Sequence, residues 1–264
     1  MNKKILLDKI ISYFIKEEKI PESLEDKISL WKDLVSQEQI ENIPENILSS
    51  EDKFLRLELI NRKLTDGEKL PSINRSLNLK NKYGDKLSLW KGDITTIYSD
   101  SIINPVTNNI LKWENIDSKS SCFNVFFRSG MRLVLKCKSL LNENELSISD
   151  VLITRAYNLP CDYLINVVLP QFNEKLTLED EKIISMSYRN ALECAKNNMV
   201  KTVVVPSLFF EDSDDMKKSA KVIINVVEKY LDENKTIFDK VIFQVNKDDE
   251  YNIYYDYLIG DKDA

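Results

Sequence analysis

The chain has 264 residues, of which 43% are hydrophobic, and its 37 Lys and Arg residues against 43 Asp and Glu residues give a formal net charge of −6. A mildly acidic surface with both signs mixed gives no general reason to expect a nucleic-acid or anionic-membrane partner. The sequence contains no histidine, which excludes histidine acid–base catalysis and histidine-ligated zinc.

Membrane insertion and secretion are not expected from the sequence. No apolar run approaches the roughly 20 residues of a membrane span, and the short run Ile5 to Leu7 is broken at once by Asp8, with no cleavage site after it. The four cysteines are widely scattered, and no pair has metal-ligand spacing. We therefore expect a cytoplasmic protein with reduced thiols at Cys122, Cys137, Cys161 and Cys194.

Three segments with apolar residues at helical spacing come first in the chain, at residues 5–14, 28–35 and 54–60. Ser50 and Asp52 are expected to cap the third helix near its start. Residues 63–84 are polar and contain Gly67, Pro71 and Gly84, which is typical of a linker or surface loop. We place a boundary here, between a helical N-terminal extension (residues 1–80) and a second domain (residues 81–264).

Strands alternate with helices in the second domain. Helices are predicted over residues 177–197 and 217–231, the first with a variant of the capping box at Thr177 and Asp180. The run Val200 to Val205 is apolar and β-branched, as in a strand that is buried on both faces. This alternation predicts a three-layer α/β/α architecture. The predicted strands are residues 87–90, 101–104, 151–154, 163–168, 200–205 and 237–245.

Four blocks of sequence, in order, resemble the macrodomain family. They are Leu-Trp-Lys-Gly-Asp-Ile-Thr (89–95), Ser-Ile-Ile-Asn-Pro-Val-Thr-Asn (101–108), Ile-Thr-Arg-Ala-Tyr-Asn-Leu-Pro (153–160) and Tyr-Arg-Asn-Ala-Leu (188–192). The likeness covers roughly Lys86 to Tyr255 and implies an ADP-ribose-binding fold with a mixed central sheet. The helical extension and the Leu-Trp pair resemble one branch, the zinc-containing protein-ADP-ribose hydrolases.

The resemblance implies a ligand role for four residues. In macrodomains the residue matching Asp93 accepts a hydrogen bond from the adenine amino group, and the backbone N–H matching that of Ile94 also contacts the base. Asp93 could instead cap the short helix that follows it. Asn104 matches the first Asn of the family's strand end, although it could anchor the loop through backbone hydrogen bonds. Thr107 replaces the second Asn, which contacts the distal ribose in relatives.

The family's zinc ligands have no equivalents in this sequence. By spacing, the two Cys and one His of the zinc branch fall on residues that offer neither thiolate nor imidazole, so no zinc cofactor is expected. Asp117 and Cys122 are nearby, but two mismatched groups do not make a tetrahedral site. The glycine-rich first loop of relatives is also missing, since residues 110–121 contain no glycine. The substituted zinc positions lie near Trp113, Ser118 or Lys119, and Ser120.

The second phosphate-binding loop departs further from the family. Its two glycines fall on acids, near Glu211 and Asp214, and carboxylates there would repel a diphosphate. The preferred interpretation of this run is a solvated acidic loop that caps the next helix, and the alternative is a divalent-cation site. Relatives also have His and Gly where this chain has Asn166 and Leu169. Tyr157 to Pro160 are expected to hold a turn.

We therefore expect a degenerate, macrodomain-like pseudoenzyme with lost or altered binding of ADP-ribose or a related nucleotide. Its role would be regulation or interaction with a protein partner. The alternative is a divergent protein-ADP-ribosyl hydrolase, in which water attacks the anomeric carbon of the ribose. Without histidine or zinc, a carboxylate such as Asp117 or Glu211 would have to activate that water. The sequence leaves the choice between binding protein and enzyme open.

Overall fold

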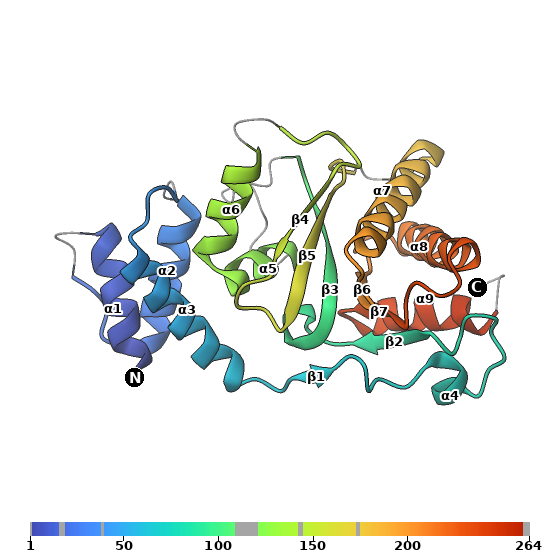
Figure 1. Ribbon diagram of the computed structural model, residues 1–264, viewed down its shortest axis with the longest axis horizontal. Helices are drawn as coiled ribbons and strands as arrows, with labels where there is room; N and C mark the ends of the chain where they lie inside the picture. Colours follow the sequence, from blue (N-terminus) through green and yellow to red (C-terminus); the bar gives the residue numbers. More distant parts are fainter. Residues whose placement is uncertain are drawn as a thin grey trace. The chain divides into compact units, whose positions relative to one another are not determined.

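The computed structural model describes residues 2–15, 19–37, 40–108, 121–141, 145–172 and 175–260. The chain divides into two compact units (Figure 1). The first comprises Met1–Lys63, Ile110–Asn144 and Arg155–Leu159, and the second comprises Leu64–Asn109, Glu145–Thr154 and Pro160–Ala264.

The first unit is helical, with α1 (Lys3–Phe14), α2 (Leu24–Gln37), α3 (Glu45–Ile60), α5 (Ser121–Ser129) and α6 (Met131–Leu141). Its core contains the Trp31 ring, which lies 5.3 Å from the ring of Phe54 and 5.7 Å from that of Phe127. The three predicted N-terminal helices are present. The predicted cap of the third helix is wrong, because α3 begins at Glu45 and so includes Ser50 and Asp52.

The second unit contains a seven-stranded sheet. Along it the strands run in the order β2-β7-β6-β3-β5-β4, and β1 pairs with β3 off this path. Residues 156–160 alone connect β4 to β5, which is too short for a parallel crossover, so this pair is antiparallel and the sheet is mixed. The strands are β1 (Thr65–Asp66), β2 (Leu87–Lys91), β3 (Ile97–Val106), β4 (Val151–Arg155), β5 (Cys161–Val168), β6 (Thr202–Pro206) and β7 (Lys240–Val245).

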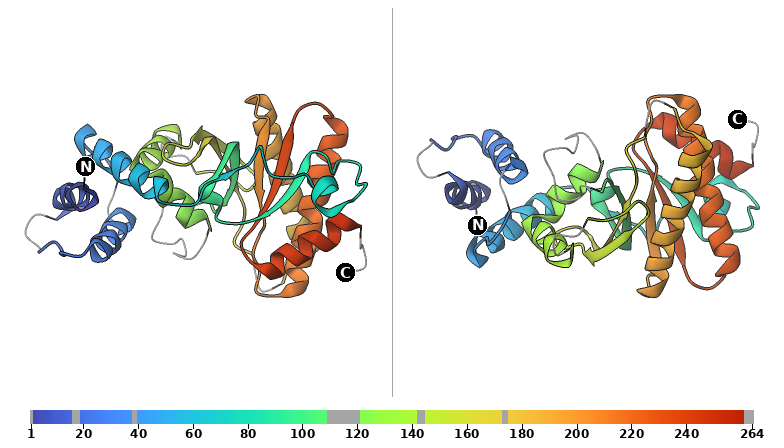
Figure 2. Two further views of the ribbon diagram at one scale, coloured as in Figure 1. Left: turned by 90° about the horizontal axis from the view of Figure 1, so that it is seen from below. Right: turned by 90° about the horizontal axis from the view of Figure 1, so that it is seen from above.

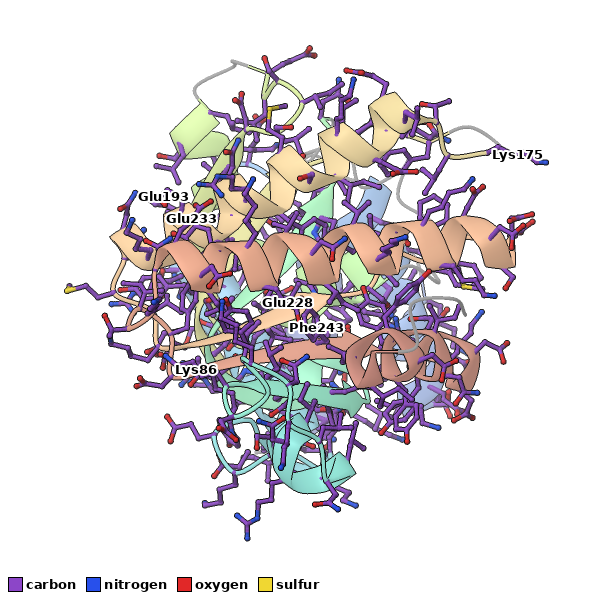
Figure 3. The ribbon with its side chains drawn as sticks, turned by 90° about the vertical axis from the view of Figure 1, so that its right-hand side faces the viewer. Lys86, Lys175, Glu193, Glu228, Glu233 and Phe243 are labelled. Carbon is purple, nitrogen blue, oxygen red and sulfur yellow. The ribbon has the colours of Figure 1, made fainter. Side chains whose placement is uncertain are left out.

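Helices α7 (Leu178–Asn197) and α8 (Ser213–Glu233) lie side by side along this sheet (Figure 2). The Tyr230 hydroxyl of α8 donates to Glu193 of α7 at 2.7 Å, and Figure 3 shows Glu193 and Glu233 at neighbouring ends of the two helices. The predicted capping box is confirmed, since Thr177 and Asp180 bond reciprocally at the start of α7. All of β6 is buried, as predicted for this strand.

Two helices in this unit were not predicted from the sequence. They are the short α4 (Ile73–Leu77), inside the segment expected to be a linker, and α9 (Asp248–Ile259), which follows β7. The ring of Tyr254 on α9 lies 5.6 Å from that of Phe243, so α9 contributes to the core. The expected α/β class is confirmed. In the part of the chain that the structure describes, no helix is long and apolar enough to cross a bilayer.

Candidate functional site

The topology of the sheet indicates where a ligand would bind. Strands β3 and β6 are parallel neighbours, but the chain continues from β3 toward β5 on one side and from β6 toward β7 on the other. In open α/β sheets, ligands bind outside the carboxyl ends of the strands at such a switch point. The residues that follow β2, β3, β6 and β7 are therefore the candidate site, which lies within the second unit.

Asp93 follows β2 and caps the 3-10 helix formed by Ile94–Thr96. Its Oδ1 accepts hydrogen bonds from the Thr95 backbone N–H at 2.9 Å and from the Thr95 hydroxyl at 2.7 Å. The predicted capping role is thus confirmed. The Asp93 side chain is exposed and Ile94 is buried.

Asn104 and Thr107, the two residues that the sequence predicts at the end of β3, have different environments. Asn104 is only 2% exposed, and its Nδ2 donates to Oδ1 of Asn166, its neighbour on β5, at 2.9 Å. The amide of Asn166 donates in turn to the Leu152 carbonyl at 3.4 Å. Asn104 is therefore held by a side-chain partner inside the sheet, whereas Thr107 lies exposed beyond the end of β3.

The acidic loop after β6 ends in a cap that the sequence predicted. Asp212 is the N-cap of α8, and its carboxylate accepts from the backbone N–H groups of Asp214 at 2.8 Å and Asp215 at 3.1 Å. The first N–H groups of a long helix are the groups to which an anionic ligand would bind. Here an anionic side chain of the same chain already holds two of them.

The same loop presents aromatic side chains. Phe209 is 51% exposed, and the Lys247 ammonium lies 3.9 Å from the centre of its ring. Phe210 packs against Phe172, with the two ring centres 5.6 Å apart. Bulky rings therefore occupy the loop in which the family resemblance implies glycines.

A hydrogen-bond network that the sequence analysis missed connects the turns after β2, β6 and β7. Gln244 is fully buried, and its Nε2 donates to the Gly92 carbonyl at 2.8 Å and to Asn246 at 3.1 Å. Glu250, 3% exposed, accepts from the Ser207 hydroxyl at 2.5 Å and from the Asn246 N–H at 3.2 Å. A polar residue inside the otherwise apolar run of β7 was the available signal for Gln244.

The predicted loss of zinc falls outside the described residues. Trp113, Asp117, Ser118, Lys119 and Ser120 lie within 109–120, and nothing is described of the Cys122 side chain. The donor set itself does not fit a catalytic zinc, because the matched positions carry no thiolate or imidazole and the chain has no histidine. Among the described residues, no group of three or more acidic or cysteine side chains is placed to hold a metal ion.

The Tyr-Asn-Leu-Pro block has the structural role expected for it. Tyr157 has a left-handed backbone with φ of 57°, and the Leu159 N–H closes the turn onto the Ala156 carbonyl at 3.2 Å. The Asn158 amide donates to Asp52 at 2.9 Å and to the Ser129 carbonyl at 3.0 Å. These contacts stabilise the first unit.

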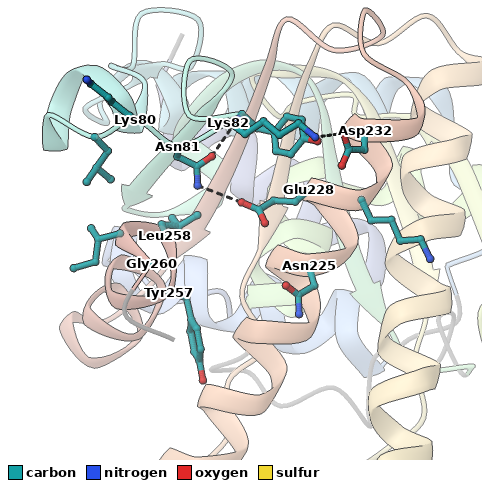
Figure 4. Close-up of a pocket in the computed structure, with 13 residues that line it drawn as sticks. Lys80, Asn81, Lys82, Asn225, Glu228, Asp232, Tyr257, Leu258 and Gly260 are labelled. Carbon is teal, nitrogen blue, oxygen red and sulfur yellow. Dashed lines mark hydrogen bonds and ion pairs between the residues drawn. The ribbon is translucent and has the colours of Figure 1, made fainter. Parts of the chain in front are cut away.

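A separate hollow of about 630 Å³ lies elsewhere in the second unit (Figure 4). It is formed by residues that precede β2 and by the carboxyl-terminal parts of α8 and α9. Within it, Lys82 pairs with Asp232 and the Asn81 amide donates to Glu228 at 3.3 Å. It does not include the residues that follow β3 and β6.

Residues 107–210 match the family model described as Macro domain. The chain belongs to the macrodomain family. A protein-ADP-ribose hydrolase of Staphylococcus aureus (strain MSSA476) is 25% identical over 245 residues, which span 89% of this chain and 86% of the relative. One of Treponema medium is 24% identical over 259 residues, with 93% and 95% covered.

Solved macrodomain structures share the fold. That of Trypanosoma brucei in complex with ADP-ribose superposes with a TM-score of 0.61 at 17% identity, covering 86% of this chain and 94% of the other. A complex of the Trypanosoma brucei macrodomain with ADP is also similar, with a TM-score of 0.60 at 16% identity, covering 98% of this chain and 97% of the other. The predicted macrodomain fold, with a mixed sheet flanked by helices and with helices at the N-terminus, is confirmed.

Proposed function

We propose that this macrodomain is a non-catalytic nucleotide-binding protein whose cleft keeps the adenine end and alters the diphosphate end. The observation that carries the proposal is the position of the Asp212 carboxylate, on the N–H groups of Asp214 and Asp215. The adenine end is supported by Asp93, which lies exposed at the turn after β2. Complexes of the Trypanosoma brucei macrodomain with ADP-ribose and ADP make an adenine nucleotide the natural class of ligand.

Electrostatics indicate how strongly the diphosphate is disfavoured. Glu211, Asp212 and Asp214 are all exposed at the start of α8. Each like-charge contact at about 4 Å costs about 1 kcal/mol in water-like surroundings. Two such contacts would weaken ADP-ribose binding by roughly thirtyfold. Charge alone would therefore make the affinity for a diphosphate lower here than at a helix start whose N–H groups have no acidic side chain beside them.

A regulatory or interaction role, with a protein partner and without zinc, follows from this proposal. The chain has no histidine to act as a general base. Phe209 and Phe210 occupy the loop beside the cleft, and exposed aromatic side chains favour contact with another protein over phosphate binding.

A calorimetric titration with ADP-ribose tests the proposal. We expect wild-type affinity weaker than about 100 μM, and an Asp93→Ala variant should lose at least tenfold of what remains. Asp212→Ser keeps an equally good helix cap but removes the charge, so it should tighten ADP-ribose binding about fivefold. Wild-type affinity of a few micromolar, unchanged in Asp212→Ser, would overturn the altered diphosphate end.

Protein-ADP-ribosyl hydrolysis is the second candidate, because relatives that match nearly the whole chain are named protein-ADP-ribose hydrolases. Of the two carboxylates expected to activate water, Asp117 lies outside the described residues and Glu211 is exposed just before α8. Release of ADP-ribose from a modified protein above the enzyme-free blank, reduced at least tenfold in Glu211→Gln, would establish this activity in place of the non-catalytic role.

A further inference from the structure

Ser207 is the first residue after β6, at the switch point of the sheet. Its hydroxyl already donates a hydrogen bond to another side chain of the protein. The hydroxyl donates to Oε2 of Glu250 at 2.5 Å. The carboxylate of Glu250 is buried, with 3% of the residue exposed, and the Asn246 N–H also donates to Oε2 at 3.2 Å. Oε2 of Glu250 therefore accepts two hydrogen bonds, one of which holds the Ser207 hydroxyl proton.

A serine hydroxyl has one proton and two lone pairs. Because the Ser207 proton is already bonded to Glu250, this hydroxyl can only accept a hydrogen bond from a ligand. We infer that Glu250 is a specificity-determining residue: by holding the Ser207 proton, it makes this end of the cleft select ligand hydroxyl or amino groups over phosphate oxygens. The inference rests on the proposed function, since it names which part of a nucleotide the cleft accepts. It assigns the ligand to the nucleosides, with adenosine as the probe.

The backbone N–H of Ser207 and two N–H groups at the start of α8 are also occupied. The Ser207 backbone N–H donates to the Gln244 carbonyl at 2.8 Å. The N–H groups of Asp214 and Asp215 donate to Asp212. A phosphate would therefore have to break an existing hydrogen bond to use the N–H or O–H of Ser207 or these two N–H groups of α8, whereas a hydroxyl or amino group would find an acceptor in the Ser207 hydroxyl oxygen.

Acceptors are in surplus in the buried network behind Ser207. In the part of the chain that the structure describes, Gln244 Oε1 and Glu250 Oε1 are buried and have no hydrogen-bond partner. Both donors of the Gln244 amide are already used, on Gly92 and Asn246. Unpaired buried acceptors are costly, and they are satisfied by donors rather than by anions.

The test is a calorimetric comparison of adenosine, AMP and ADP-ribose on the full chain. We expect wild type to bind adenosine at least fivefold more tightly than AMP or ADP-ribose. Ser207→Ala removes the acceptor and should weaken adenosine binding by roughly three- to tenfold, the equivalent of one neutral hydrogen bond. Ser76→Ala, at an exposed serine on α4, is the matched control and should bind as wild type does.

Two variants of Glu250 separate hydrogen-bond direction from charge. Glu250→Ala releases the Ser207 proton and should bring the adenosine-to-AMP preference close to one. Glu250→Gln keeps an oxygen that accepts from Ser207, so it should restore most of the preference that Glu250→Ala loses. If Glu250→Ala does not fold, the other two variants test the inference. It is overturned if Ser207→Ala leaves the adenosine affinity unchanged, or if Glu250→Gln loses the preference for adenosine over AMP.

The wild-type titrations distinguish this inference from the proposed function. If wild type binds AMP or ADP-ribose as tightly as adenosine, the specificity of Ser207 and Glu250 is wrong although the adenine end stands. If it binds none of the three, the proposed function fails and the inference fails with it.

Discussion

Gly130, between α5 and α6, has a left-handed backbone with φ of 90°. A Cβ at this position would lie 2.9 Å from Glu51 Oε2 and 2.9 Å from Leu55 Cδ1. Both the backbone conformation and the space therefore require glycine. Gly260, at the end of α9, has nearly the same φ of 91°, but no atom of the described residues lies within 4 Å of its Cβ position.

These two glycines make a matched pair. Gly260→Ala should cost only the conformational term, about 1 kcal/mol of unfolding free energy. Gly130→Ala adds a steric clash with Glu51 and Leu55, so we expect a loss of about 3 kcal/mol. Urea denaturation of both variants measures the difference. Equal losses would show that the contact of Gly130 with α3 is not tight.

At the scale of elements, α3 and α6 are joined through a buried acid. Oε2 of Glu51 on α3 accepts from the Met131 N–H at the start of α6 at 2.6 Å, and Glu51 is 1% exposed. Arg132 beside it donates to Asp52 at 2.7 Å and pairs with Glu45. Burial raises the pKa of Glu51 to about 8, and the Asp52 charge acts in the same direction, against the lowering effect of the Met131 N–H.

This pKa predicts how the stability of the first unit depends on pH. The folded state holds a proton on Glu51 up to about pH 8, whereas the unfolded chain releases it near the ordinary glutamate pKa of 4.5. The stability that Glu51 contributes is thus fully present below pH 4.5 and is lost as pH rises toward 8. The slope is at most about 1.4 kcal/mol per pH unit.

The Glu51→Gln variant has no such proton to lose. The difference in unfolding free energy between wild type and Glu51→Gln should therefore shift against wild type from pH 5 to pH 8, by roughly 1 kcal/mol per pH unit, and then level off. Denaturation at several pH values measures it. Glu25→Gln, at an exposed residue of α2, is the control for replacing a surface glutamate. A pH-independent difference for Glu51→Gln would mean that this carboxyl is ionised in the folded protein.

At the scale of the whole chain, the parts that the sequence predicted are those with a strong local pattern. The capping box at Thr177 and the all-apolar run of β6 encode their structure within a few residues. The two-residue β1 and the five-residue α4 are too short to show any period, so their structure depends on tertiary contacts. Helix α9 had a usable signal, since Tyr251, Tyr254 and Leu258 recur at helical spacing.

In the candidate site, too, local interactions were predicted from the sequence and long-range interactions were not. The caps formed by Asp93 and Asp212 were predicted because each acts on N–H groups within three residues. The bond between Ser207 and Glu250 spans 43 residues and exists only because β6 and β7 pair in a particular register. No pattern local to either residue shows it, and Glu250 alone looks like an ordinary acid in the first turn of a helix.

We propose that this macrodomain no longer receives a diphosphate at the start of α8. A crystal structure of the chain grown with saturating ADP-ribose tests it most directly. We expect adenosine density beside Asp93, with the Asp212 carboxylate still on the N–H groups of Asp214 and Asp215 and the phosphates away from α8. An ordered diphosphate bonded to those N–H groups, with Asp212 displaced, would contradict it.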